Sequence, residues 1–139
     1  MLRDNLNCFF HVAGYDPAKS DQQVWYVEIQ NKKKTRMNPP GQFGIAWAGE
    51  SDTISKILNP SAEIDPSNNQ IKQVYPNFQV PYQFFTLQDA IDFAEYSVRT
   101  TIDTMRFQPR PKTVGGPIDI LVIKPNEQKW IKRKELSSK

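Results

Sequence analysis

Cys8 and His11, the only cysteine and the only histidine of the chain, have side chains suited to nucleophilic chemistry. A catalytic cysteine needs a base within hydrogen-bonding reach and an electropositive, partly open setting. The two residues are three positions apart in an apolar run that predicts a β-strand, so their side chains should point to opposite faces. We therefore predict that His11 is structural and that Cys8 is a buried, inert thiol.

Carboxylates are the remaining candidates for acid–base chemistry. Asp103 falls in a predicted helix, where a solvated residue is one interpretation and part of a shared site is the other. Asp119 begins a predicted strand and should be hydrogen-bonded there. The glycine pair at 115–116 precedes a strand, so it lacks the helix N-terminus that binds phosphate. The histidine, the cysteine and the carboxylates do not occur at a spacing typical of a metal site. We expect neither a metal nor a cofactor.

The charge of the chain is mild. Its 139 residues carry a formal net charge of +3, and much of the excess lies in two runs at 32–36 and 129–134. A nucleic-acid-binding protein usually spreads basic residues over a face among aromatic ones, so nucleic acid is not an expected partner. The N-terminal residues lack the apolar stretch of a signal peptide, and no run reaches the length of a membrane span. We expect a soluble, cytoplasmic protein with no membrane contact.

The first half of the chain predicts three strands and one short helix. The strands are expected at 8–13, buried on at least one face, at 24–29, and at 43–49. The basic run between the second and third strands, 31–36, predicts a solvated connector. Ser51 and Asp52 can cap a helix that ends at Asn59-Pro60.

The second half contains the strongest helical signal. Residues 61–85 predict a long irregular excursion with a helical turn near 71–75. A capping-box pattern at Thr86 then precedes an apolar stripe, which predicts a helix from Leu87 to about Arg106. The apolar run 118–123 predicts an interior strand, covered on both faces and paired as a hairpin with a strand starting at 129. The tail 132–139 is expected to fray.

Strands and helices that are grouped in this way predict an α+β fold, in a single domain over residues 1–139. The interior strand needs a helix on one side and another layer on the other. That requirement suggests two stacked sheets with helices outside.

The order of these elements resembles the C-terminal portion of a proteasome-type N-terminal-nucleophile (Ntn) hydrolase subunit. The glycine-proline entry to the strand at 118–123 is most similar to the bacterial proteasome homologues. The similar segments are 10–16 with its Ala-Gly-Tyr-Asp sequence, 24–27, 43–50, 89–103 and 114–120. The resemblance implies a partial four-layer αββα sandwich whose subunits stack into rings. It also implies threonine-type peptide or amide hydrolysis, in which an N-terminal Thr, Ser or Cys is the nucleophile and its own amine is the base.

The resemblance also implies that the family's nucleophile is missing. That residue opens the family's first strand, which would precede Met1, and Leu2 has no hydroxyl or thiol. Asp103 matches in register an Asp at the end of the family's late helix. Ser51 lies slightly after the position of a serine that orients the terminal amine. We expect this chain by itself to be inactive, with peptide as a substrate only in a full-length form.

Three functions remain open. The chain is a fragment of an Ntn-hydrolase subunit, a non-catalytic ring subunit of the same fold, or a small module whose basic loops bind nucleic acid. The first two predict homo- or hetero-oligomers, with the excursion 61–85 as a subunit contact. They also predict poor solubility or obligate oligomerisation, because Phe9, Trp25 and Trp47 would lose their cover without the first strands of the sandwich.

Overall fold

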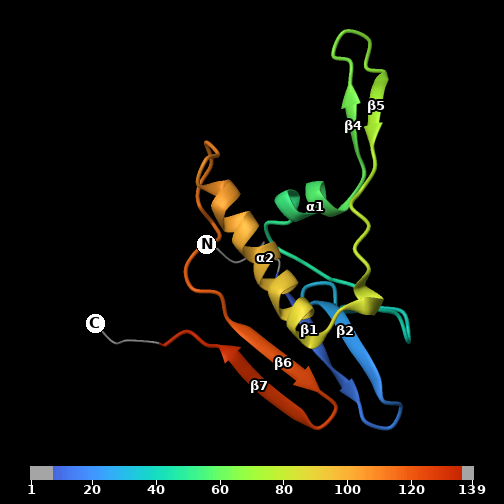
Figure 1. The fold of residues 1–139 in the computed structure, drawn as a ribbon, viewed down its shortest axis with the longest axis vertical. Coiled ribbons are helices and arrows are strands. Elements are labelled where there is room, and N and C mark those ends of the chain that lie inside the picture. Colours follow the sequence, from blue (N-terminus) through green and yellow to red (C-terminus); the bar gives the residue numbers. More distant parts are fainter. Residues whose placement is uncertain (1–7, 136–139) are drawn as a thin grey trace. The chain divides into compact units, whose positions relative to one another are not determined.

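A computed structural model describes residues 8–135 of the chain (Figure 1). The fold is mixed α+β, with three small antiparallel sheets and two α-helices, which confirms the predicted class at this level. The chain separates into two compact units, one from Met1–Ala48 with Asp119–Arg133 and one from Gly49–Ile118 with Lys134–Lys139. The single domain over residues 1–139 stays a prediction, because a compact unit can be part of a larger domain.

The first unit contains a three-stranded sheet and a hairpin. The sheet has the order β1-β2-β3, with β1 at Phe9–Asp16, β2 at Asp21–Glu28 and β3 at Lys33–Arg36. Strands β1 and β2 pair over eight residues without a register shift, from Phe9 opposite Glu28 to Asp16 opposite Asp21. The turn between them is closed by the Asp16 carboxylate, which accepts a hydrogen bond from the Ala18 N–H at 3.0 Å.

The strand β3 corrects the prediction of an unstructured connector at 31–36. Lys33 and Lys34 have low intrinsic strand preference. They are nevertheless held in the ladder by pairing with Glu28 and Val27 of β2. The exposure of both lysines agrees with the solvated character that the sequence predicted.

The predicted strand at 43–49 is not formed. Residues 43–48 carry no strand assignment, and Phe43 is 66% exposed. An apolar run becomes a strand only where another strand supplies hydrogen-bonding partners. Among the described residues, no strand pairs with this segment.

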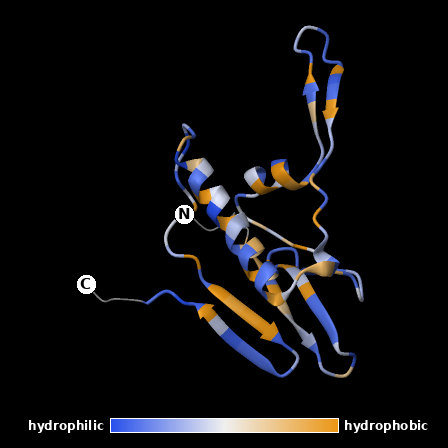
Figure 2. Ribbon diagram, viewed as in Figure 1, coloured by the Kyte–Doolittle hydropathy of each residue, from blue (hydrophilic) through white to orange (hydrophobic). Residues whose placement is uncertain are grey.

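The hairpin of the first unit consists of β6, Ile120–Lys124, and β7, Glu127–Lys132, as predicted. Figure 2 shows β6 as almost continuously apolar and β7 as largely polar. The prediction that this apolar run is interior and covered on both faces is wrong for this structure. Ile120 is buried, but β6 pairs only with β7 in a two-stranded sheet and Leu121 is 38% exposed.

The second unit contains both α-helices. Helix α1, Asp52–Leu58, and helix α2, Leu87–Met105, agree with the predicted bounds and contact each other. The Thr86 side chain accepts a hydrogen bond from the Asp89 N–H at 3.1 Å, and the Asp89 carboxylate accepts one from the Thr86 N–H at 2.8 Å. This reciprocal pair is the predicted capping box, and it fixes where α2 begins.

The buried side of α2 differs from the predicted apolar stripe. The buried residues are Ser97, Thr101 and Met105, whereas Leu87 and Val98 of the predicted stripe are exposed. The hydroxyls of Ser97 and Thr101 donate to the carbonyls of Phe93 and Ser97, so burial leaves neither without a partner. The buried side of α2 therefore combines two hydrogen-bonded hydroxyls with the apolar Met105.

The predicted excursion at 61–85 is an ordered hairpin followed by a single helical turn. Strand β4, Ser61–Ile64, pairs with β5, Ile71–Tyr75, and a short 3₁₀ helix (η1) spans Tyr82–Phe84. The prediction of a helical turn near 71–75 is wrong, because those residues form β5 and pair with β4. Edge-on ring contacts among Tyr82, Phe85 and Phe93 attach η1 to the first turns of α2.

Candidate functional site

The most completely hydrogen-bonded part of the first unit lies where β2 begins and β3 ends. The Arg36 guanidinium forms an ion pair with the Asp21 carboxylate at 2.8 Å. Its Nε donates to the Asn38 carbonyl at 2.7 Å, and its terminal nitrogen also donates to the Gln22 carbonyl at 3.2 Å. The Arg36 and Asp21 side chains are only 22% and 13% exposed, so water screens this pair weakly.

Asn38 extends the sheet beyond the end of β3. Its side-chain oxygen accepts a hydrogen bond from the Val24 N–H at 2.8 Å, and its amide nitrogen donates to the Gln22 carbonyl at 2.8 Å. The Met37 N–H donates to the Val24 carbonyl at 2.8 Å. The side chain of Asn38 thus replaces the backbone groups of a further strand residue, and it holds the next loop against β2.

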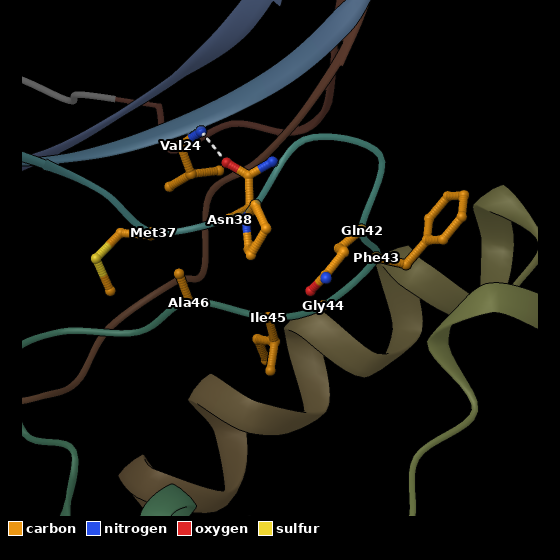
Figure 3. A pocket seen from close by; sticks show the side chains of 9 residues that line it. Val24, Met37, Asn38, Gln42, Phe43, Gly44, Ile45 and Ala46 are labelled. Atoms are coloured by element: carbon orange, nitrogen blue, oxygen red, sulfur yellow. Dashed lines mark hydrogen bonds between the residues drawn. The ribbon is translucent and has the colours of Figure 1, made fainter.

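This loop, 37–46, encloses a cavity of about 200 Å³ against β2. The lining consists of apolar side chains, two amides and a glycine (Figure 3), namely Val24, Met37, Asn38, Pro39, Gln42, Phe43, Gly44, Ile45 and Ala46. Gly41, with φ of +71°, allows the turn that brings the chain back towards β2. The Gln42 N–H donates to the Pro39 carbonyl at 3.2 Å and closes that turn.

The chemistry available in this cavity is limited by its lining. No lining residue can exchange a proton near neutral pH or attack a carbonyl. Both ends of the Asn38 amide are already used within the sheet. The cavity is therefore suited to an apolar group about the size of one large side chain, and unsuited to acid–base or nucleophilic catalysis.

Cys8 lines a second cavity of about 180 Å³ and is exposed, so the predicted burial of this thiol is wrong. The lining includes the Glu28 carboxylate, which accepts a hydrogen bond from the Asn31 side chain at 2.7 Å. His11 does not complete a catalytic pair here, because its ring lies edge-on to the Tyr26 ring, with centroids 5.7 Å apart.

The two residues that the resemblance assigned to a catalytic site have local roles in the second unit. Asp103 lies in the last turn of α2 with its side chain 56% exposed, and its carboxylate is 3.9 Å from the Arg106 guanidinium. Ser51 precedes α1, and its carbonyl accepts a hydrogen bond from the Ser55 N–H at 2.9 Å. The Ser51 side chain makes no capping bond. These contacts are local to the helix that each residue precedes or belongs to. They do not bring Ser51 and Asp103 together in one site.

Arg110 makes an ion-pair cluster that the sequence did not indicate. Its guanidinium lies 3.2 Å from the Glu50 carboxylate and 3.0 Å from that of Asp52, and the Thr113 hydroxyl donates to Glu50 at 2.7 Å. The hydrogen bond from Arg110 lowers the pKa of Asp52 below its ordinary value. The cluster ties the start of α1 to the segment after α2, across about sixty positions of sequence, which is why no local pattern reveals it.

The described residues offer no metal site and no membrane span. Between residues 8 and 135, no group of three His, Cys, Asp or Glu side chains is close enough to hold an ion. Within the same part of the chain, neither helix is both long and apolar enough to cross a bilayer. Comparisons of the chain with protein families, with characterised proteins and with solved structures found no match.

Proposed function

We propose that this chain is an assembly subunit with part of an Ntn-hydrolase-like fold, and that it acts by association and not by catalysis. The neutral cavity at 37–46 and the exposed position of Asp103 support the non-catalytic part of this proposal. The three-stranded sheet supports the association part, and it carries the proposal.

The observation that carries the proposal is that both faces of β1 present uncovered apolar side chains. Successive residues of a strand point to opposite faces. Phe9 is 41% exposed on one face, while Phe10 and Val12 are 52% and 53% exposed on the other. A strand of this kind is typical of the interior of a layered fold, where cover comes from both sides.

The edge of β1 is also open. Among the described residues, β1 pairs only with β2, so the backbone groups along its other edge have no ladder partner. Unpaired edges of apolar strands readily accept a strand from another chain. A further strand at this edge would extend the sheet, and a second sheet would cover Phe10 and Val12.

The proposed fold is a partial αββα sandwich. Several features support it: the β1–β2 hairpin with its Ala13-Gly14-Tyr15-Asp16 sequence, the long capped helix α2, and the turn at Gly116, with φ of +88°, shortly before β6. In such a sandwich the segment 43–48, which lies in no sheet here, and the edge of β1 would pair with further strands. We propose ring assembly, because repeated head-to-tail contacts between identical subunits close into rings.

The mass of the chain in solution tests this proposal. Sedimentation velocity over a range of concentrations should give a mass that is a multiple of 16.1 kDa, and fluorogenic peptide amides should not be hydrolysed. A monomer with a sharp thermal transition at every concentration would contradict the proposed association. Turnover of the peptides by the purified chain would contradict the proposed absence of catalysis.

A further inference from the structure

The β4–β5 hairpin of the second unit has one wholly apolar face, and a β-bulge creates that face. Glu63 lies opposite Gln73, but the next residue of β4, Ile64, lies opposite Ile71. Lys72 is therefore the extra residue of the bulge. In a regular ladder Lys72 would stand opposite Ile64, and Ile71 would turn to the other face.

The bulge places the apolar and the polar residues of the hairpin on opposite faces. One face carries Ala62, Ile64, Ile71 and Val74, and the other carries Ser61, Glu63, Gln73 and Tyr75. Two hydrogen bonds agree with this assignment, since the Glu63 carboxylate accepts from the Lys72 ammonium at 2.9 Å and from the Tyr75 hydroxyl at 3.3 Å. The charges of the hairpin strands thus neutralise each other on the polar face.

The apolar face has no cover, although the hairpin is well ordered locally. Every residue of β4 and β5 is exposed. The tip is closed by the Asp65 carboxylate, which accepts from the Ser67 N–H at 2.9 Å and from the Ser67 hydroxyl at 2.6 Å. A lone two-stranded hairpin is at best marginally stable in water, so a face of this composition calls for a partner.

We propose that the apolar face of the β4–β5 hairpin docks on the same face of a second copy of the chain, about a twofold axis. This proposal rests on the proposed function as an assembly subunit and specifies one of its contacts. Because the face carries no charge, two copies of it meet without electrostatic repulsion. A twofold contact also buries the same residues on both sides.

The size of the apolar surface fits such a contact. Ile64, Ile71 and Val74 are 53%, 65% and 60% exposed. With Ala62 they present about 300 Å² of apolar surface, the lower end of the patch size that marks interaction sites on monomers. Since somewhat more than half of an interface is apolar, the full contact would bury about 500 Å² on each copy, or about 1,000 Å² in total, which is the lower limit for a specific interface.

Neighbouring residues of β5 provide a matched test, because Val74 and Gln73 lie on opposite faces of the same strand. Sedimentation velocity should show a smaller assembly for Val74→Lys than for the wild-type chain, and an unchanged assembly for Gln73→Lys. Equal masses for the two variants, whether both reduced or both unchanged, would overturn the docking of this face. If only the docking is overturned, the wild-type chain still assembles. A wild-type chain that is monomeric throughout would overturn the proposed function and this contact together.

A cross-linking experiment keeps the proposal testable if Val74→Lys does not fold. In a Cys8→Ser background, Val74→Cys should be joined to a second copy by a thiol-specific reagent spanning about 10 Å, the separation of stacked sheets. Gln73→Cys should be joined at least several-fold less efficiently. Cross-linking of the two variants with equal efficiency would overturn the proposed face.

Discussion

The three-stranded sheet and the β4–β5 hairpin distribute their apolar side chains in different ways. In the sheet, Phe9 and Phe10 lie on opposite faces of β1, and both are exposed. In the hairpin, a bulge at Lys72 collects the apolar residues of both strands on one face. The comparison indicates two kinds of contact. A sheet whose apolar side chains need cover on two faces is suited to the inside of a layered fold. A hairpin that needs cover on one face is suited to a single docking contact.

The two regions also differ in how they are held together. At the end of the sheet, the guanidinium of Arg36 bonds to Asp21, Gln22 and Asn38 with little exposure to water. The hairpin relies on its tip and on the exposed pair of Lys72 and Glu63, whose side chains are 65% and 44% exposed. Exposed pairs of this kind contribute little to stability. We therefore expect the sheet to keep its structure without a partner more readily than the hairpin does.

Arg36→Ala should have the largest effect, because it removes three hydrogen bonds and leaves the Asp21 carboxylate partly buried without its cation. The expected loss in the free energy of unfolding is about 3 kcal/mol, measured by chemical denaturation. Lys33→Ala on the same strand removes an exposed side chain and should cost less than about 0.5 kcal/mol. Similar losses for the two variants would mean that the bonds of Arg36 do not stabilise the sheet. The contrast in stability with the hairpin would then be lost.

Serine substitutions at Phe9 and Phe10 test whether both faces of the sheet are covered in the assembly. Each variant should weaken association about tenfold, as judged from the concentration dependence of sedimentation. Each loses apolar surface whose burial contributes roughly 1.4 kcal/mol to the free energy of association. Phe107→Ser is a suitable control, since that ring is 84% exposed and lies outside the sheet. If only one of the two sheet variants weakens association, the sheet needs a single partner layer and the contrast with the hairpin disappears.

Thr86→Ala should destabilise the second unit by about 1 kcal/mol, because α2 loses the side-chain acceptor of its capping box. The loss should be visible as a lower midpoint in thermal unfolding followed by circular dichroism. Thr86→Ser retains the acceptor and should stay close to wild type. A wild-type midpoint for the alanine variant would show that ring packing around Tyr82 and Phe93, without the cap, determines where the helix begins.

Acid should loosen the hairpin tip before it affects the body of the sheet. The hydrogen bonds from the Ser67 hydroxyl and N–H lower the pKa of Asp65 below the usual value of about 3.9. A carboxyl group whose pKa is depressed on folding stabilises the fold at pH values above its unfolded pKa. That contribution is lost as the pH falls below about 4 and through the lower folded pKa.

The Ser67 amide signal, followed by NMR from pH 7 to pH 2, should report this change at the tip. Asp65→Asn keeps an oxygen acceptor without a titrating proton, so its Ser67 signal should be insensitive to acid over the same range. An unaltered signal in the wild-type chain down to pH 2 would contradict a role for the ionised carboxylate at the tip. This is the smallest expected effect, because the carboxylate bonds only to Ser67 within the same turn.

Local patterns predicted the elements whose ends are set by neighbouring residues. The capping box at Thr86 and the Asn59-Pro60 stop gave the bounds of both helices, because caps and breakers act within one turn. The β-branched and aromatic residues of β2 likewise predicted a strand. In contrast, β3 and β5 were missed, since their lysines and glutamines have weak strand preference and are held by pairing with a partner strand.

The candidate site was less predictable than the fold. Ser51 precedes the first helix and Asp103 lies in the second, but the cavity is formed elsewhere, by Asn38 and the loop that follows it. The Asn-Pro-Pro-Gly sequence at 38–41 signals a turn. It does not indicate that the Asn38 side chain bonds two backbone groups of β2, because those partners are about fifteen positions away in sequence.

The α+β class, the bounds of both helices and the β1–β2 and β6–β7 hairpins could be predicted from the sequence. These properties depend on side-chain periodicity and on bonds between near neighbours. The exposure of Cys8, the burial of Ser97 and Thr101 on α2 and the bulge of the β4–β5 hairpin were established only by the folded structure. Those features depend on contacts between segments, which local sequence patterns do not specify.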